Sequence, residues 1–243
     1  MAKEKSRPAG KVQGEDNLIN RIVSSISSRV RARVQFRYGI FFEADVKSAV
    51  IGTPMNLPGL TFQPVEAALF EKEQIFAVRS RWKTFRDRVG QRHLCYGFLN
   101  PDGAVVSYIW ISGDATKAVS VPFEFPGFRI LIRPGSAYIW DCFTAPPYRQ
   151  QGLYRQGLLN GIAICSNKEV EKAYIYCAAA NIPSRNGILS AGFKEKFRFR
   201  VFRIGSMCII KKSREGVGVV KIGQDYDPLA SERSDHDSPH LVW

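Results

Sequence analysis

The sequence predicts a single α/β domain in which helices flank one mixed β-sheet. Strand-like segments come first, and from residue 137 the expected order is strand, helix, strand, helix, strand, strand. This order is typical of a mixed sheet that carries helices on its faces. The 243 residues are 45% hydrophobic and 23% charged, which fits one globular domain with appendages and excludes a wholly disordered chain or a disulfide miniprotein.

The N-terminal segments differ in character. Residues 1–16 are polar and charged, so we expect an unpacked leader. They lack the apolar run of a signal peptide, and no apolar stretch of the chain is long enough to span a membrane, so we expect a cytoplasmic protein. Residues 17–34 carry apolar side chains every four positions from Leu18, which predicts an amphipathic basic helix. This helix either packs on the protein's own core, as its lack of an aromatic anchor favours, or makes a peripheral contact with acidic lipid at the inner membrane face.

The first half of the domain is expected to be rich in strands. Residues 34–44 are aromatic and β-branched and predict the first strand. After a loop containing Pro and Gly, residues 65–89 have a helical pattern. The sequence Asn100-Pro101-Asp102-Gly103 is typical of a turn, so the flanking segments 94–99 and 104–111 predict a β-hairpin.

The second half alternates strands and helices. The expected order is strand, helix, strand, helix and two strands, at residues 137–144, 153–167, 173–178, 183–191, 194–203 and 207–211. Residues 213–243 hold six acidic and three basic side chains, so we expect an acidic flexible tail outside a single domain of residues 17–212.

The charge balance points to an anionic partner. The chain carries +13, and because residues 213–243 contribute −3, the remainder carries +16. Nucleic acid, an acidic membrane, a nucleotide-like cofactor and an acidic substrate all fit this charge. No nucleic-acid recognition motif accompanies it, so no specific nucleic acid is expected. The five cysteines are scattered without a CxxC pair and predict reduced core thiols, and the three histidines do not cluster, so no metal site is expected.

The stretch from Trp140 to Tyr154 carries the chemistry. A strand ends, a polar loop follows, and a helix begins, so unpaired N–H groups and the positive end of a helix dipole meet where phosphate can bind. Arg149 adds positive charge, and Gly152 allows the backbone to approach a ligand. Gly157 and Gly161 within the helix predict close packing against the sheet.

These residues resemble the acetyl-CoA motif of the GNAT acyl-CoA-dependent N-acetyltransferases. The motif stands here as Thr144-Ala145-Pro146-Pro147-Tyr148-Arg149-Gln150-Gln151-Gly152-Leu153-Tyr154. A second signature of the family, an Asn followed eleven residues later by Gly-Phe, appears as Asn181 with Gly192-Phe193. The resemblance covers about residues 92–212. It implies the GNAT-type central mixed sheet flanked by helices, acetyl-CoA as the acyl donor, and direct attack on the thioester by a small-molecule or glycan amine acceptor.

The resemblance also implies roles for individual residues. The CoA pyrophosphate would be held by five consecutive backbone N–H groups, those of Gln150, Gln151, Gly152, Leu153 and Tyr154, with Arg149 at the rim. The strand edge at Phe143 and Thr144 would pair with pantetheine. This strand splays from its neighbour in the family, so that a free N–H can also polarise the thioester carbonyl. Asn181 and Ser184 would hydrogen-bond the pantetheine from the other side.

Attack by an amine requires a group that takes its proton. Asp141, just before the motif, is the candidate, and the other interpretation of this residue is a hydrogen-bonded Asp at a strand end. Many relatives place a Tyr that protonates the leaving thiolate where this chain has Ile188. Either Tyr154 or Tyr148 donates that proton, or solvent does, or the protein is a CoA-binding module with little or no catalysis.

Two further patterns leave alternatives open. Four aromatic residues alternate along two expected strands and either fill the core or line an acceptor cleft: Tyr108, Trp110, Tyr138 and Trp140. Four cations share one face of a late strand, which is either solvated or holds the CoA 3′-phosphate or an acidic acceptor: Lys194, Lys196, Arg198 and Arg200. The Gly-Leu-Tyr form of the loop resembles bacterial GNAT sequences that we associate with amino sugars and envelope-glycan precursors.

Overall fold

The computed structural model describes most of the domain. The described residues are 34–48, 55–66, 69, 87–91, 93–123, 128–205, 207–212, 217–221 and 224–230. The expected leader at residues 1–16, all but the last residue of the expected helix at 17–34, and most of the expected helix at 65–89 lie outside these residues.

The secondary structure follows the predicted order closely. The described elements are β1 (Val34–Asp45), β2 (Thr61–Pro64), β3 (Leu94–Leu99), β4 (Val105–Asp114), β5 (Val119–Pro122), β6 (Arg129–Ile132), β7 (Ser136–Thr144), the short 3₁₀ helix η2 (Pro146–Tyr148), α5 (Leu153–Asn167), β8 (Lys172–Ala178), α6 (Ile182–Ser190), β9 (Lys194–Ile204), β10 (Met207–Lys212), β11 (Val217–Lys221) and β12 (Asp225–Tyr226). The predicted first strand, the hairpin around Asn100–Gly103 and the alternation from β7 to β10 are confirmed.

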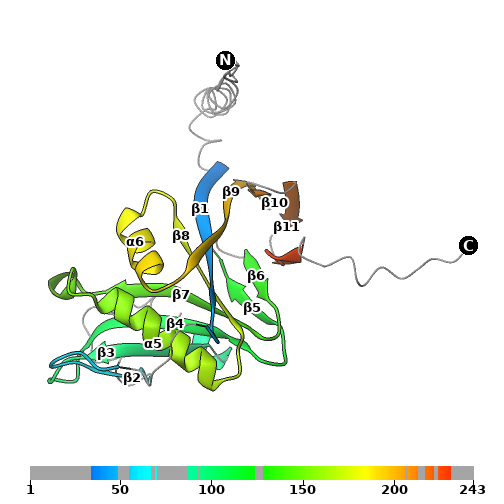
Figure 1. Ribbon diagram of the computed structural model, residues 1–243. Coiled ribbons are helices and arrows are strands. Elements are labelled where there is room, and N and C mark those ends of the chain that lie inside the picture. Colours follow the sequence, from blue (N-terminus) through cyan, green and yellow to red (C-terminus); the bar gives the residue numbers. More distant parts are fainter. Residues whose placement is uncertain are drawn as a thin grey trace, which may run out of the picture.

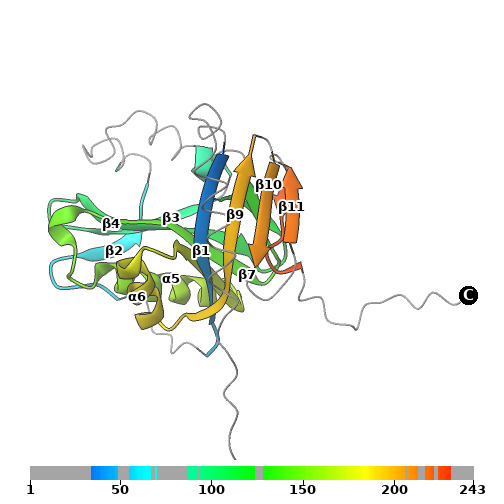
Figure 2. The ribbon, with the colours of Figure 1, turned by 90° about the horizontal axis from the view of Figure 1, so that it is seen from above.

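The strands form two sheets. Nine of them make a mixed sheet in the order β11-β10-β9-β1-β8-β7-β4-β3-β2, and β12-β6-β5 make a small second sheet. Within the large sheet β7 and β8 pair in parallel, whereas the other described pairs are antiparallel. Figure 1 shows α5 and α6 on one face of this sheet, and Figure 2 shows β1, β9, β10 and β11 side by side. The predicted mixed sheet with flanking helices is confirmed.

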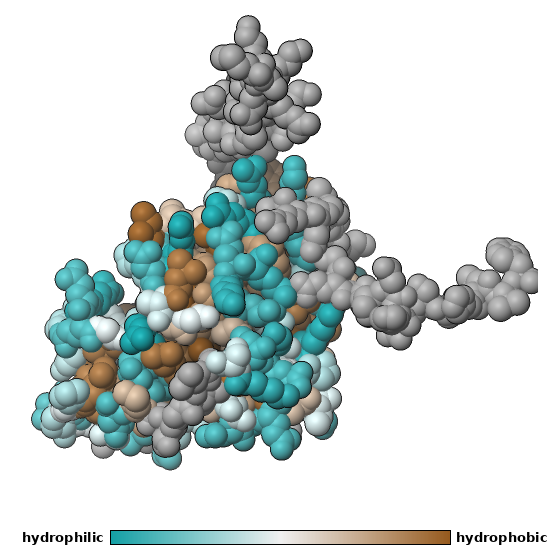
Figure 3. Space-filling view, in the orientation of Figure 1, coloured by the Kyte–Doolittle hydropathy of each residue, from teal (hydrophilic) through white to brown (hydrophobic). Residues whose placement is uncertain are grey.

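A hydrophobic cluster fills each face of the large sheet. The face under α5 and α6 carries an aliphatic cluster that includes Ile109, Ile139 and Leu158. The opposite face carries an aromatic cluster, in which Trp110 and Tyr138 are each 1% exposed, and it packs against the small sheet. The four alternating aromatic residues are therefore core side chains, and Trp140 also lines the cleft described below. The surface on the helical face is mostly hydrophilic, with hydrophobic groups over α6 (Figure 3).

Close packing of α5 on the sheet depends on one glycine more than the other. A Cβ added at Gly161 would lie 2.9 Å from Cδ1 of Ile109 and 3.0 Å from Cδ1 of Ile139. A Cβ at Gly157 would lie 3.5 Å from the nearest atom, which is ordinary contact. The prediction from these two glycines therefore holds at Gly161. No helix among the described residues is both long and apolar enough to cross a bilayer.

The folded part of the chain extends beyond residue 212. Strand β11 pairs with β10, and β12 pairs in parallel with β6. Asp227 forms an ion pair with Arg133 at 2.9 Å, and Leu229 is 5% exposed. The described residues 217–221 and 224–230 are therefore part of the fold, where a flexible tail was expected, because Asp225 and Asp227 pair with arginines and Leu229 packs in the aromatic cluster.

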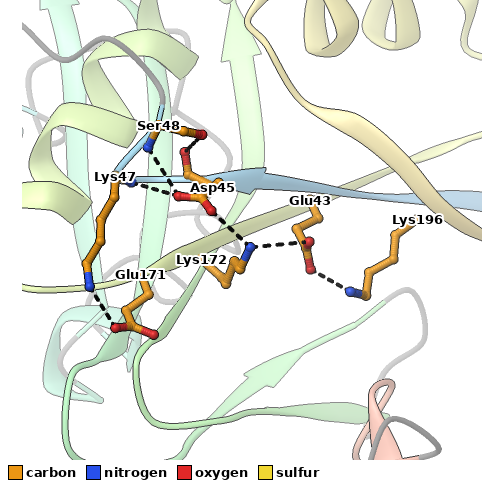
Figure 4. Close-up of polar contacts among 7 residues, drawn as sticks. All are labelled: Glu43, Asp45, Lys47, Ser48, Glu171, Lys172 and Lys196. Atoms are coloured by element: carbon orange, nitrogen blue, oxygen red, sulfur yellow. Dashed lines mark hydrogen bonds and ion pairs between the residues drawn. The ribbon is translucent and has the colours of Figure 1, made fainter.

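A chain of ion pairs joins β1, β8 and β9 near the end of β1 (Figure 4). Lys172 lies 3.7 Å from Glu43 and 3.2 Å from Asp45, and Lys196 lies 2.5 Å from Glu43. Burial raises the pKa of Glu43, but the bond and charge of Lys196 outweigh it, so the net shift is downward. The more exposed Lys172–Asp45 pair contributes little stability.

Candidate functional site

A cleft opens where β7 and β8 part. Their parallel pairing begins at Ser136 and ends at the pair Tyr138–Tyr174, although β7 continues to Thr144 and β8 to Ala178. Beyond that pair the two strands diverge. A cleft of about 860 Å³ lies between their ends and is also lined by the first residues of α5 and by α6. The expected splay of the strand that precedes the loop is confirmed.

A β-bulge shapes the β7 side of the cleft. Trp140 pairs with Trp110 on β4, and the next pair is Phe143 with Tyr108. Between these two pairs β7 advances by three residues and β4 by two. The extra residue lies at Asp141–Cys142, and Asp141 has φ of +43°, a left-handed conformation that Asp tolerates better than most residues. Bulges redirect side chains next to functional sites. This one takes Asp141 out of the regular pairing with β4, whereas Phe143 and Thr144 pair with β4 again beyond it.

The structure brings nearly all predicted site residues to one place. The cleft is lined by the predicted residues Asp141, Phe143, Thr144, Arg149, Gln150, Gly152, Leu153, Tyr154, Asn181 and Ser184. Gln151 is the exception, since it is not in the lining and its Nε2 donates to the carbonyl of Pro147 at 3.0 Å. The two predicted motifs thus form opposite walls.

The first wall ends at the N-terminus of α5. Gly152 is the N-cap, with φ of +77°, and no side chain caps this helix. Within the described part of the chain, the backbone N–H groups from Gln150 to Arg155 donate no hydrogen bond to protein. Arg149 lies beside them, with its Nε donating to the carbonyl of Thr144 at 3.1 Å. This arrangement of free donors and positive charge suits a phosphate group.

The second wall is built by α6. Asn181 is its N-cap, and Oδ1 of Asn181 accepts from the Ser184 N–H at 3.2 Å, which leaves the amide NH₂ available to a ligand. The Ser184 hydroxyl is 2.9 Å from the Tyr154 hydroxyl, so this contact joins the walls. A Cβ at Gly187 would lie 2.5 Å from the Tyr154 ring. Sequence reasoning missed Gly187, whose signal was its position three residues after Ser184 on the same helix.

The ionisable groups around Tyr154 stay neutral. Burial raises the pKa of Tyr154, and burial likewise raises the pKa of Cys142 and of Cys177, both of which line the cleft. All five cysteines are free thiols, as predicted. Tyr154 therefore presents an un-ionised hydroxyl, which can donate a hydrogen bond or a proton.

Sequence reasoning also missed Arg88, which holds Asp141. Nη1 of Arg88 forms an ion pair with Oδ2 of Asp141. The guanidinium carbon is 4.3 Å from the ring centroid of Trp140 and 5.1 Å from that of Trp110. The Arg88 side chain is 18% exposed, against 42% for Asp141. No local signal marks Arg88, because its partners come from strands far along the chain.

A buried hydrogen-bond chain fixes the Trp140 ring. Its Nε1 donates to Oγ of Ser112 at 2.7 Å, and the same Oγ lies 2.8 Å from Nδ1 of His93. Because indole is only a donor, Ser112 accepts from Trp140 and has its own hydrogen for His93. Burial, together with the charges of Arg129 and Arg88, lowers the pKa of His93 to about 4, so this histidine is neutral near pH 7.

The remaining candidates lie away from the cleft. Ile188 is completely buried in the aliphatic cluster. Lys196 pairs with Glu43, and Arg198 makes two bonds to Glu195. None of the four late-strand cations is in the cleft lining as described. A search of the described residues finds no group of three or more His, Cys, Asp or Glu arranged to hold a metal ion.

Comparison with known proteins gives a family match. Residues 63–193 match the model of the acetyltransferase (GNAT) family. No curated protein matches the chain.

Several solved structures are similar to this chain at low sequence identity. A Drosophila protein is 12% identical with a TM-score of 0.49, covering 77% of this chain and 57% of its own. A GCN5-related N-acetyltransferase from Sphaerobacter thermophilus is 13% identical with a TM-score of 0.47, covering 86% and 59%. A GNAT-family acetyltransferase from Colwellia psychrerythraea is 12% identical with a TM-score of 0.49, covering 83% and 76%. The chain thus spans less than two thirds of the length of the first two.

Proposed function

The chain belongs to the acetyltransferase (GNAT) family, and from that premise we propose that it transfers an acetyl or other short acyl group from acyl-CoA to the amine of an acceptor. The observation that carries the proposal is the divergence of β7 and β8 beside the uncapped N-terminus of α5. A diphosphate and an extended arm need such an arrangement, in which free N–H donors stand at one end of an open strand edge.

The residues of the cleft fit CoA. The N–H groups from Gln150 to Tyr154 would bind the pyrophosphate, and Arg149 would add its charge at the rim. The edge of β7 at Phe143 and Thr144, and the polar groups of α6, would bind pantetheine from its two sides. When bound, acetyl-CoA supplies the activated thioester.

Proton movements are assigned to two groups that line the cleft, Asp141 of β7 and Tyr154 of α5. Asp141 takes one proton from the acceptor ammonium, directly or through one water. The amine nitrogen then bonds to the carbonyl carbon and loses its second proton to solvent as the carbon–sulfur bond breaks. A backbone N–H near Phe143 polarises the carbonyl oxygen. Tyr154 then donates its hydroxyl proton to the sulfur and regains one from solvent, a role supported by the position of its hydroxyl in the cleft beside that of Ser184.

For the acceptor we propose a small amine, such as an amino sugar or an envelope-glycan precursor. The support is the Gly152-Leu153-Tyr154 form of the loop, together with the aromatic and polar character of the cleft at Phe143, Tyr176 and Asp141. We further propose a cytoplasmic location with peripheral membrane contact through residues 17–34. The net charge of +13 favours acceptors that carry negative groups.

A second function is a CoA-binding module without efficient turnover. The observation that favours it is the pairing of Asp141 with Arg88, because Arg88 already occupies Oδ2 of the carboxylate that would accept the proton. This candidate predicts affinity for acetyl-CoA without release of free CoA in the presence of any amine.

The test is calorimetric titration with acetyl-CoA, followed by an assay of thiol release with a panel of amines. Gly152→Glu should abolish binding, because it adds a negative charge among the phosphate donors. Gly135→Glu is the matched control, since Gly135 also has a left-handed φ, +71° against +77°, and open space at Cβ, but precedes the far end of β7. Wild-type protein with no affinity for acetyl-CoA would refute the proposal, and binding without turnover would select the second function.

A further inference from the structure

Asp141 is placed at the cleft by two independent devices. The bulge sets its backbone outside the regular ladder, three residues beyond the last β7–β8 pair. The bulge does not fix the carboxylate, because the side chain is 42% exposed and more than one staggered rotamer is open to it. Among the described residues, the bond from Nη1 of Arg88 is the contact recorded for this carboxylate.

Arg88 itself is rigidly held. Its guanidinium lies over Trp140 and Trp110, at 4.3 Å and 5.1 Å from the two ring centroids. A flat guanidinium stacks on indole in a way that the ammonium of Lys cannot reproduce. Trp140 is in turn fixed by its bond to Ser112, and Trp110 is 1% exposed. The orientation of the carboxylate is therefore transmitted from the buried core through Arg88.

From this geometry we propose that Arg88 is a positioning residue for acyl transfer, which aims the Asp141 carboxylate at the acceptor amine. The inference rests on the proposed function. Oδ2 of Asp141 is bound to Arg88, so Oδ1 is the oxygen left to accept a hydrogen bond from the acceptor ammonium. Arg88 acts through Asp141 and is not itself a catalytic residue.

Positioning makes a specific kinetic prediction. Arg88→Ala should lower kcat/KM for the acceptor by about tenfold or more, because misplacement of a reacting group by about 1 Å is costly. The affinity for acetyl-CoA should stay unchanged, since Arg88 is not in the cleft lining. Arg88→Lys should recover only part of the loss, and added methylguanidinium should restore activity to Arg88→Ala by taking the place of the guanidinium over the two indoles.

The double variant separates positioning from a structural role. If Arg88 acts through Asp141, then Arg88→Ala combined with Asp141→Asn should be no slower than Asp141→Asn alone. Arg133→Ala is the matched control, because Arg133 pairs with Asp227 at 2.9 Å, with side chains 30% and 21% exposed, outside the cleft. It should lower the melting temperature without changing the kinetics for the acceptor.

The outcomes are distinct. Full acceptor kinetics in Arg88→Ala, losses that multiply in the double variant, or a folded Arg88→Ala that methylguanidinium does not restore would each overturn the positioning role. Wild-type protein that binds acetyl-CoA but consumes none with any amine, or that has no acetyl-CoA affinity in calorimetry, would instead be a failure of the proposed acyl transfer.

Discussion

The buried His93 should make the stability of the protein depend on pH in a window that few other groups share. The side chain is 2% exposed, and burial, with the charges of Arg129 and Arg88, lowers its pKa from 6.5 to about 4. The unfolded chain therefore takes up a proton near pH 6.5, whereas the folded chain does so only near pH 4. Stability from this residue is fully present above pH 6.5 and is lost as the pH falls toward 4.

The size of the effect follows from the two pKa values. The lowered pKa of His93 corresponds to about 3 kcal/mol of unfolding free energy in total. About 2 kcal/mol of this should be lost between pH 8 and pH 5. Carboxylates contribute little in this range. The lowered pKa values of Glu43, Asp45 and Glu171 start from 4.5, 3.8 and 4.5, so their contribution is lost mainly below pH 5.

Urea unfolding at pH 8, 6.5 and 5, followed by circular dichroism, measures this dependence. His93→Gln should flatten the dependence of the unfolding free energy between pH 8 and pH 5, whatever its stability at pH 8. The other two histidines, His236 and His240, are present in both proteins and cancel in the comparison. A His93→Gln variant that loses as much stability on acidification as the wild type would refute the assigned role of His93.

Two further predictions concern packing around α5. Gly161→Ala should lower the unfolding free energy by about 1–3 kcal/mol, since its Cβ would meet Ile109 at 2.9 Å. Gly157→Ala should be neutral or stabilising by up to about 1 kcal/mol, and equal urea midpoints for the two would contradict the packing argument. Asn160→Ala should lower the free energy of unfolding by about 2 kcal/mol, because the side-chain carbonyl and NH₂ of Asn160 each form a hydrogen bond of 2.8 Å with the Met55 backbone. Asn167→Ala, at an exposed position of α5, should lower it much less. Similar midpoints for the two Asn variants would refute this account.

The sequence predicts elements well where the signal is local. The turn at Asn100–Gly103, the alternating strands and the helix after Gly152 depend on side chains within a few residues of one another. Each of these was placed within a residue or two of its position in the structure. The two motif walls also came together, because the order strand, helix, strand, helix leaves few ways to pack a right-handed crossover.

What the sequence missed depends on contacts between distant segments. β5, β6 and β12 are strands of two to four residues, and they exist because they pair with one another and cover the aromatic cluster. Composition predicted a tail from residue 213, since Asp225 and Asp227 look solvated in sequence. In the fold they pair with Arg129 and Arg133, about a hundred positions earlier.

Arg88 illustrates the same difficulty within the site. Its sequence neighbours are Asp87 and Val89, which gave no reason to single it out. Its function arises only when the β4–β7 register places Trp110 opposite Trp140, so that the two rings lie within 5.1 Å of one guanidinium. The bulge at Asp141 was likewise invisible, because a bulge is a property of the pairing between two strands and not of either one.

In the sequence, Ile188 is the residue that raises the choice between an enzyme and a CoA-binding module without turnover, because many relatives have a proton-donating Tyr there. The absence of a Tyr at this position matters less in the structure, because Ile188 is fully buried in the aliphatic cluster and does not line the cleft. A hydroxyl that does reach the cleft belongs to Tyr154, whose OH lies beside that of Ser184. The Tyr154 ring fits there because Gly187 has no side chain. An isoleucine at position 188 is therefore compatible with turnover whenever Tyr154 or solvent supplies the proton. Activity therefore depends on Asp141. If Arg88 orients the carboxylate toward the acceptor, Asp141 can take its proton, and if Arg88 only pairs with it, the protein binds CoA without turnover.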